Sequence, residues 1–349
     1  MRPPGRWVRP QEDVWTAVAV AAVVVVFALD LALAGEGFEG TLLVGPVVAS
    51  ATVRPRRTAQ VLSLALLSGI VAGAVHDRLT TLSQALRLAG VLVGGGFCVL
   101  AAHWRERREH DLQRVTRVAE VAQLAILRPI PSRVGPVAFA SRYLSAAEQA
   151  FIGGDLYEVV PSANGVRVVV GDVRGKGLEA VHLAALVLGS FREAATVEHA
   201  LEDVAAAVDR AVSTDIALED FVTAVFIEFR RGGEITVVNC GHHPPLRVSG
   251  FGAQYLAGEQ ASTPLGLTPS FTVQSHRLSR GDRVLLYTDG LVEARSADRC
   301  FFELAPDTVE ILKRRSLDAA LEGLVASVLR HAGGRLDDDL ALLLAEVRG

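Results

Sequence analysis

The sequence predicts an α+β domain, in which antiparallel sheets are flanked by helices, preceded by an all-α transmembrane region. Long apolar runs are confined to the first hundred of the 349 residues, although half of all residues are hydrophobic. From about Pro136 onward, short strands follow one another with helices in pairs between them, which favours antiparallel sheets over a doubly wound parallel sheet. We therefore divide the chain into a membrane region (1–102), a juxtamembrane helical linker (103–131) and a mixed domain (132–349).

Charge and cysteine content exclude several classes of protein. The formal net charge is -4, which gives no argument for a nucleic-acid partner. The three cysteines, Cys98, Cys240 and Cys300, form no CxxC pair. That pattern fits a reducing cytoplasm and excludes a structural zinc site of the usual spacing. Cys240 has no evident activating base, so we expect a small buried side chain there rather than a nucleophile.

Four apolar runs predict four transmembrane helices, at 15–34, 42–53, 59–75 and 86–102. The first is nearly unbroken and has the length needed to cross a bilayer, whereas the second is shorter. A signal peptide is a poor explanation because several such runs follow one another.

The placement of charge predicts the topology of these spans. With four spans, the basic clusters at 2–9, 54–57 and 105–117 all fall on one side, and Glu36 and Glu39 fall on the other. The positive-inside rule then places both termini and the mixed domain in the cytoplasm. We expect a multi-pass protein of the cell membrane, with the lipid bilayer as one partner.

Asp30 lies near the outer end of the first predicted span. A carboxylate there is either an intramembrane sensor or pairing site, or a side chain that reaches the membrane interface. We favour the interface.

The linker is predicted to be helical. It lacks glycine and proline over 103–127 and carries apolar residues at near-helical spacing: Leu112, Val115, Val118, Val121, Leu124 and Leu127. A homodimer seam and a helix packed on its own domain explain this spacing equally well, because two to three heptads are marginal for a coiled coil. Pro129 and Pro131 are expected to end the helix.

A predicted hairpin brings two carboxylates together. The apolar runs 156–161 and 166–171 are joined by Asn164-Gly165, a strong hairpin signal. Folding the chain there places Asp155 within about one residue of the position opposite Asp172. Adjacent carboxylates repel unless a cation or a shared proton lies between them. Oxygen ligands alone favour a hard cation such as Mg²⁺ or Mn²⁺.

Further acids stand at strand ends. Asp289 follows the apolar run 283–287, and Asp337, Asp338 and Asp339 precede the run 340–347. Each of them alone is most often a turn residue or a helix cap. The set, together with Asp155 and Asp172, predicts a binuclear metal centre able to activate water for the displacement of a phosphate ester.

Three other motifs suggest alternative sites. The glycines of 171–177 are spaced too closely for a P-loop. Because adjacent strand side chains point to opposite faces, His242-His243 is expected to form a turn rather than a metal or acid site. Arg174 is either a bidentate phosphate ligand or a solvated loop residue.

Several motifs occur in an order that resembles the PPM-type metal-dependent serine/threonine phosphatases (protein phosphatase 2C), most closely the bacterial SpoIIE-like branch. They are GGDLYE (153–158), GDVRGKG (171–177), FVTAVF (221–226), NCGHHPPL (239–246), PLGL (264–267), LLYTDGLVEA (285–294) and DDDLALLLAEV (337–347). The resemblance covers roughly residues 120–348. It implies an α-β-β-α sandwich that binds two Mn²⁺ or Mg²⁺ ions.

By this resemblance, Asp172 would bridge both metals, helped by the backbone carbonyl of Val173. Asp155 would act through one metal, largely by way of water, and Asp289 and Asp338 would complete the site. Asp339 is the second choice for the last ligand, because three consecutive aspartates leave the register uncertain by one. Leu156, Glu158 and Arg174 depart from residues common in the family, but no ligand position is vacated.

The implied activity is that of a membrane-anchored protein phosphatase. Its substrate would be a phosphorylated regulatory protein of the anti-anti-sigma type, in a partner-switching pathway. The alternative is a regulatory binding module that keeps the fold and hydrolyses slowly or not at all. The two differ in whether partner binding survives the loss of Asp172 or Asp289.

Overall fold

The computed structural model describes residues 9–32, 38–145, 154–215, 220–258 and 262–348. Glu36 and Gly153, which belong to the patterns above, lie outside these ranges. The chain divides into two compact units, Met1–Arg114 and Val115–Gly349, and each is described by itself.

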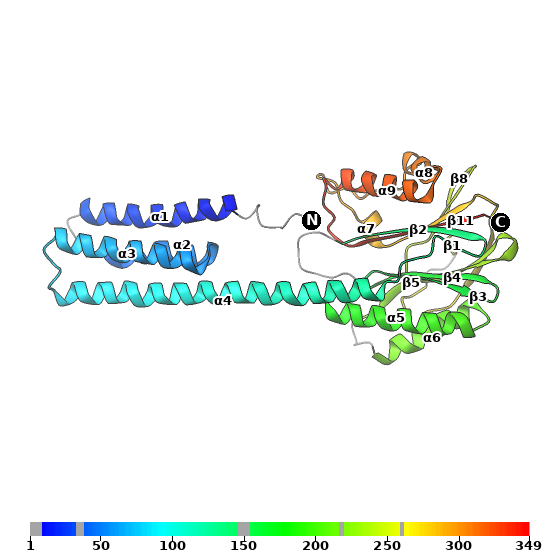
Figure 1. Cartoon of the computed structure of the whole chain (residues 1–349), viewed down its shortest axis with the longest axis horizontal. Helices are drawn as coiled ribbons and strands as arrows, with labels where there is room; N and C mark the ends of the chain where they lie inside the picture. The colour runs from blue at the N-terminus through cyan, green and yellow to red at the C-terminus, as the bar shows by residue number, and fades with distance from the viewer. Residues whose placement is uncertain (1–8, 33–37, 146–153, 216–219, 259–261, 349) are drawn as a thin grey trace. The chain divides into compact units, whose positions relative to one another are not determined.

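The first unit is helical (Figure 1). It contains α1 (Arg9–Ala32), η1 (Phe38–Leu43), α2 (Val44–Thr52), α3 (Pro55–Val75) and the first part of α4 (Leu82–Ile126). The second apolar run forms only the nine-residue α2 after η1. Because a helix rises about 1.5 Å per residue, α2 alone is too short to cross a bilayer.

Four helices in the described part of the chain are long and apolar enough to cross a membrane: Glu12–Ala32, Pro55–Val75, Leu82–Leu112 and Leu178–Val197. The last of these is α5, which packs on strands β3 and β4 of the second unit. Its apolar character is explained by that packing, which leaves three candidates in the first unit.

Polar contacts gather at one end of the helices in the first unit. Arg57 Nη1 pairs with Asp13 Oδ1 at 2.6 Å. Arg105 donates to the carbonyl oxygens of Ser50 and Val53, each at 2.7 Å. The start of α1, the turn between α2 and α3, and a point within α4 therefore lie together.

Asp30 is buried in this unit, with 2% of its surface exposed. Neither carboxylate oxygen has a hydrogen-bond partner among the described residues. This burial contradicts the interface position that we favoured from the sequence, because a side chain that reaches the interface would be exposed.

The last apolar run and the linker form one helix, the 45-residue α4. It ends at Ile126, three residues before Pro129. The residue directly before a proline, here Arg128, disfavours the helical backbone conformation. The side chains of Val115, Val118, Val121 and Leu124 lie outside what the structure describes. The dimer seam therefore stays a prediction.

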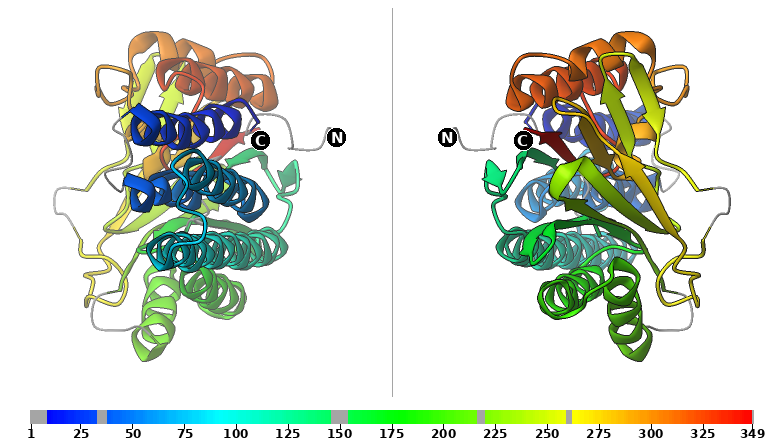
Figure 2. Two further views of the ribbon diagram at one scale, coloured as in Figure 1. Left: turned by 90° about the vertical axis from the view of Figure 1, so that its left-hand side faces the viewer. Right: turned by 90° about the vertical axis from the view of Figure 1, so that its right-hand side faces the viewer.

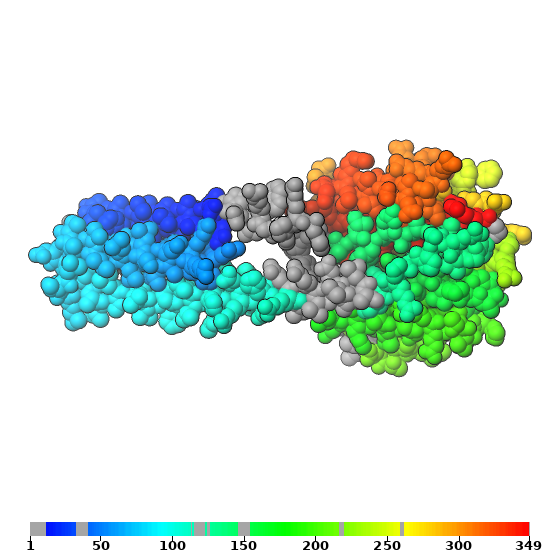
Figure 3. All heavy atoms as spheres, in the orientation of Figure 1, coloured from blue at the N-terminus to red at the C-terminus, as the bar shows by residue number. Residues whose placement is uncertain are grey.

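The second unit has the predicted four layers, which confirms the fold class (Figures 1 and 2). One sheet has the strand order β1-β2-β11-β10-β7-β8 and the other has the order β3-β4-β5-β6-β9. All the strand pairs within the two sheets are antiparallel. Helices α8 and α9 cover the first sheet, and α5 and α6 cover the second. In Figure 3 these helices form opposite outer faces of the unit.

The strands are β1 (Arg133–Val134), β2 (Val137–Leu144), β3 (Leu156–Ser162), β4 (Gly165–Val173), β5 (Val222–Arg230), β6 (Glu234–Cys240), β7 (Leu246–Ser249), β8 (Gly252–Tyr255), β9 (Val273–Arg277), β10 (Arg283–Tyr287) and β11 (Leu340–Val347). The helices are α5 (Leu178–Val197), α6 (Leu201–Asp215), α7 (Asp289–Val292), α8 (Pro306–Leu312) and α9 (Leu317–His331), with the short η2 (Arg231–Gly233) between β5 and β6. The sequence did not predict β1, β8 or α7. These are elements of two to four residues, so they carry almost no periodic signal.

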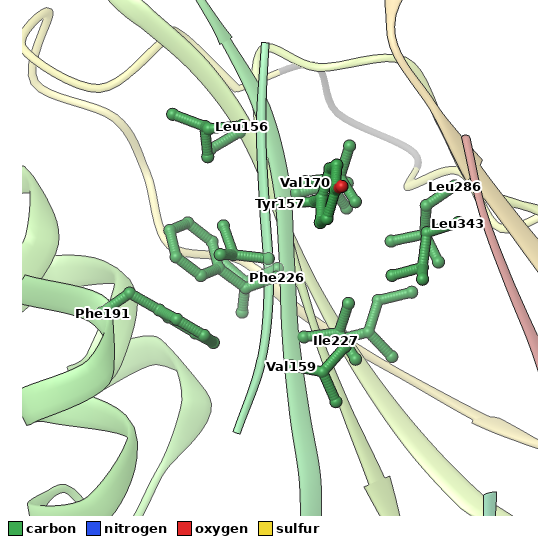
Figure 4. Packing of buried hydrophobic residues seen from close by; sticks show 14 of the residues in the cluster. Leu156, Tyr157, Val159, Val170, Phe191, Phe226, Ile227, Leu286 and Leu343 are labelled. Atoms are coloured by element: carbon green, nitrogen blue, oxygen red, sulfur yellow. The ribbon is translucent and has the colours of Figure 1, made fainter. Parts of the chain in front are cut away.

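The core follows the alternation of each strand. Figure 4 shows Phe226 of β5 against Phe191 of α5, whereas Ile227, the next residue, lies on the side of the strands that faces Leu286 and Leu343. Both phenylalanines are fully buried, and their ring centroids are 6.0 Å apart. The two faces of β5 therefore fill two different layers of the core.

A buried arginine ties β4 to the helical layer. Arg167 is 1% exposed, and its Nε donates to Glu228 Oε1 of β5 at 2.7 Å. Its remaining nitrogens donate to the carbonyl oxygens at the end of α5 and beyond it, those of Ala195, Glu198 and His199. These carbonyls have no partner within the helix, so Arg167 satisfies them.

Replacing Arg167 with alanine should lower the melting temperature of the protein by roughly 6–12 °C. Removing one partner of a buried ion pair costs about 3 kcal/mol or more, and each kcal/mol corresponds to about 2–4 °C in a domain of this size. Circular dichroism of the full chain in detergent would measure the shift. Arg231→Ala, in an exposed turn, is the matched control. Equal melting temperatures for the two variants would contradict this role.

Candidate metal centre

The hairpin places two acids face to face. In the β3–β4 ladder Leu156 pairs with Gly171, so Asp155 stands opposite Asp172 one step further along. The chain approaches closely here, because a Cβ on Gly154 would lie 2.2 Å from the carbonyl oxygen of Val173. Only glycine fits at 154, and this explains the glycine beside the acid.

The second sheet edge contributes the other acids. Asp289 begins α7 directly after β10, and Asp338 and Asp339 directly precede β11, which pairs with β10. A Cβ on Gly290 would lie 1.9 Å from the carbonyl oxygen of Asp339. The glycine after Asp289 therefore allows these two segments to meet.

Three carboxylates converge. Asp155, Asp172 and Asp289 each offer an oxygen, and these oxygens all lie within 4.8 Å of one another. Asp155 is buried, and the other two are half-buried. A set of oxygen donors at this separation fits a hard divalent cation.

The pKa values of these acids also favour a bound cation. Burial, and then the charge of Asp172, raise the pKa of Asp155 well above its ordinary value. Burial, followed by the charges of Asp289, Asp338 and Asp339, raises the pKa of Asp172 to about 8. Burial and the charge of Asp338 raise the pKa of Asp289. Without a cation, these carboxylates oppose one another's ionisation.

Asp155 is positioned by two other elements. Thr288, at the end of β10, donates its hydroxyl to Asp155 Oδ2 at 2.7 Å. Gln123, in the last turn of α4, donates its amide to the backbone carbonyl of Asp155 at 3.3 Å and to Tyr143 Oη at 2.9 Å. Tyr143 in turn donates its hydroxyl to Asp339 Oδ2.

The last two acids differ in surroundings. Asp339 is 2% exposed and accepts the hydrogen bond from Tyr143. Asp338 is more exposed, and both of its oxygens lie 3.3 Å from Lys176 Nζ. The charge of Asp338 acts on both Asp172 and Asp289. Both aspartates therefore lie beside the converging triad.

The two neighbouring histidines differ in their contacts. His242 is buried, its Nε2–H donates to the carbonyl of Tyr287, and its Nδ1 accepts from the hydroxyl of Thr223. Burial lowers its pKa to about 3, so it is neutral. Asn239 bonds to the backbone N–H and carbonyl of His242, which closes the predicted turn.

His243 stacks on the ring of Tyr287, with 5.9 Å between centroids. Both histidines line the same cavity as Asp172 and Asp289, which corrects our argument that adjacent side chains would face apart. Gly241, with φ of +70°, interrupts the strand there, so its alternation no longer applies.

Cys240 is fully buried. Burial raises the pKa of its thiol to about 12. The thiol is therefore protonated at neutral pH and takes the packing role predicted for it.

Gln123, Tyr143 and Thr288 were not predicted as site residues. Thr288 was detectable in principle, because it stands directly before Asp289 at a strand end. The other two are brought to the site by packing between elements, and nothing in the local sequence marks them.

The chain is similar to known proteins. The profile of the family described as Stage II sporulation protein E (SpoIIE) matches residues 162–348, more than half of the chain. Phosphoserine phosphatase RsbU of Bacillus subtilis (strain 168) is 22% identical over 199 residues, which cover 55% of this chain. The match spans only 59% of the length of that relative.

Solved structures share the fold. The RsbU and RsbW domains of Rv1364c from Mycobacterium tuberculosis superpose with a TM-score of 0.55 at 30% identity, covering 62% of this chain and 61% of that one. The SiaA-PP2C domain of Pseudomonas aeruginosa superposes with a TM-score of 0.57 at 20% identity, covering 70% of this chain and 99% of that domain. The α-β-β-α sandwich, the order of the motifs and the match to the profile lead to one conclusion: the chain belongs to the stage II sporulation protein E (SpoIIE) family.

Proposed function

We propose that this chain is a metal-dependent protein serine/threonine phosphatase held at the cell membrane. The observation that carries the proposal is the convergence of Asp155, Asp172 and Asp289 within 4.8 Å, in a site that raises the pKa of all three. Membership of the SpoIIE family and the likeness to phosphoserine phosphatase RsbU support it. The reaction would be hydrolysis of a phosphoserine or phosphothreonine ester by water, without a phosphoenzyme.

Two Mn²⁺ or Mg²⁺ ions would be held by Asp155, Asp172, Asp289 and Asp338, with the carbonyl of Val173 and with Asp339 as the second choice for the last ligand. When bound, such ions lower the pKa of a coordinated water and neutralise phosphate charge. The protein's own residues set the geometry: Thr288 orients Asp155, and Tyr143 orients Asp339.

The substrate is proposed to be a phosphorylated regulatory protein of a partner-switching pathway. RsbU is a phosphoserine phosphatase, and the structure from Mycobacterium tuberculosis joins an RsbU domain to an RsbW domain. These likenesses support a protein substrate rather than a small phosphate ester.

The first unit is proposed to be the membrane anchor. Three of its helices have the length and apolarity of spans, and η1 with α2 brings the chain back to the same end between the first two of them. Arg54, Arg57 and Arg105 gather at one end of it, beside the start of α1. Under the positive-inside rule, that end and the second unit would face the cytoplasm.

The end of α4 is proposed to influence the metal centre. Gln123 reaches Asp155 and Tyr143 directly. The carbonyl of Ile126 accepts from Arg192 of α5 at 3.0 Å, and Arg192 pairs with Glu158 of β3. A shift of this helix end would therefore displace the hairpin that carries Asp155.

Asp172→Asn and Asp289→Asn should each lower kcat/KM for a phosphoserine peptide by at least about 100-fold. Loss of a residue that only orients a metal ligand costs about 10- to 100-fold, so loss of a ligand costs more. The measurement is phosphate release with saturating Mn²⁺. Asp318→Asn, on α9, is the control.

The same assay separates the last two acids. Asp338→Asn should match Asp172→Asn, whereas Asp339→Asn should show the smaller loss of an orienting residue. Full activity of both Asp172→Asn and Asp289→Asn would refute the proposed function.

Metal removal should make stability depend on pH. The folded pKa values of Asp155, Asp172 and Asp289 lie above the unfolded value of about 4. The metal-free folded state therefore binds more protons than the unfolded state, and its stability falls as pH rises from about 4 to about 8. Since metal binds the deprotonated carboxylates, Mn²⁺ should raise the melting temperature more at pH 8 than at pH 6.

Thermal melting in chelator and in Mn²⁺ at both pH values would measure this difference. Asp172→Asn should reduce it, because the variant lacks one titrating ligand. A shift that is the same at pH 6 and pH 8 would contradict the assignment of these acids as ligands.

Gln123→Leu should weaken Mn²⁺ affinity by about 10- to 100-fold while leaving kcat at saturating Mn²⁺ close to that of the parent chain. The substitution removes both donated hydrogen bonds at similar volume, and such supporting contacts are worth about this much. Activity titrated against Mn²⁺ measures the change, with exposed Arg128→Ala as the control.

Deletion of residues 1–102 should also alter the Mn²⁺ dependence. An unchanged dependence in both cases would leave the first unit as a plain anchor.

A further inference from the structure

Arg174 is fixed at the end of β4 by its cross-strand neighbour. The β4–β5 ladder closes with Val173 opposite Val222, and Arg174 and Phe221 are the residues directly beyond the two strands. The backbone N–H of Arg174 donates to the carbonyl of Phe221 at 3.0 Å. Its guanidinium carbon lies 5.3 Å from the centre of the Phe221 ring. A planar cation stacked on a ring holds fewer conformations than a solvated arginine.

Arg174 lines the same cavity as the acids. Arg174 directly follows β4, which carries Asp172, and Phe221 directly precedes β5, which carries Thr223. All four line one cavity of about 270 Å³, together with Asp289 and Glu293. Arg174 therefore borders the space in front of the converging carboxylates.

A cation that borders this cavity favours binding of a phosphate ester. Asp172 and Asp289 would be balanced by bound metal ions, but Glu293 adds a negative charge to the wall, and a phosphate monoester carries close to two negative charges at neutral pH. Lys176, two residues beyond Arg174 along the chain, pairs with Asp338. A guanidinium offers a planar fork that matches two oxygens of one phosphate, which an ammonium does not.

We propose that Arg174, held on Phe221, binds the phosphoryl oxygens of the substrate and so defines a phosphate-monoester subsite beside the metal centre. The inference rests on the proposed function and adds a substrate-binding residue to it. It assigns to Phe221 the role of a positioning residue that keeps the guanidinium plane in place.

The test uses the full chain in detergent with saturating Mn²⁺ and a phosphoserine peptide. Arg174→Ala should lower kcat/KM by about 10- to 100-fold, mostly through KM, since a hydrogen bond to a charged group is worth about 1.5–3 kcal/mol. Arg174→Lys should recover only part of this loss. Phe221→Leu should give an intermediate loss, and Arg231→Ala, in the exposed turn between β5 and β6, should have no effect.

A second readout does not depend on turnover. The affinity for inorganic phosphate, measured by calorimetry in the presence of Mn²⁺, should fall in Arg174→Ala by a similar factor. The affinity of the same variant for Mn²⁺ and its melting temperature should stay those of the parent chain. If Arg174 had a purely structural role, the substitution would lower the melting temperature, and phosphate affinity would fall together with it.

The outcomes are distinct. If the parent chain is active and Arg174→Ala keeps its kcat/KM and phosphate affinity, the subsite is refuted and the proposed function stands. If Arg174→Ala loses Mn²⁺ affinity to the same extent as phosphate affinity, Arg174 supports the metal centre and the subsite is again refuted. A parent chain that releases no phosphate overturns the proposed function, and this inference with it.

Discussion

Mutual repulsion between carboxylates is the constraint on which the second unit depends. Asp155, Asp172 and Asp289 lie within 4.8 Å of one another and are all partly or fully withdrawn from water. Like charges at such separations destabilise the ionised form and raise each pKa. Only a rigid frame can hold them there, and two antiparallel sheets with helices on their outer faces supply one. The acids stand where strands end, so the repulsion between them is confined to one edge of the sandwich.

Thr288 links the two sheets at that edge. Its backbone N–H donates to the carbonyl of Ala341, and its hydroxyl accepts from the backbone N–H of the same residue at 2.9 Å. The hydroxyl then donates to Asp155, which belongs to the other sheet. One fully buried side chain therefore joins β10, β11 and the β3–β4 hairpin. The other acids are supported separately, Asp339 by Tyr143 and Asp338 by Lys176.

The sequence predicted the parts of this arrangement that depend on short-range rules. Asn164-Gly165 between apolar runs sets the hairpin, and its register brings Asp155 opposite Asp172. The runs 283–287 and 340–347 match β10 and β11 because strong apolar patterns and flanking turn residues mark them. The roles of Thr288, Tyr143 and Gln123 were not predicted, because each depends on contact between elements far apart in the chain. The turn at His242-His243 was predicted, but its two side chains line one cavity because Gly241 ends the strand alternation that we had applied to them.

The contacts of the site separate two kinds of control. Gln123 reaches the backbone of Asp155 and the hydroxyl of Tyr143, so it acts on the residues that hold the acids. Arg174 lines the cavity in front of Asp172 and is held by Phe221 of a different strand. A displacement of the end of α4 would therefore act on Asp155 and Tyr143 directly, and on Arg174 only through the β3–β4 hairpin. Metal occupancy would then respond to the helix through direct contacts, whereas phosphate recognition would respond through the hairpin that joins the two.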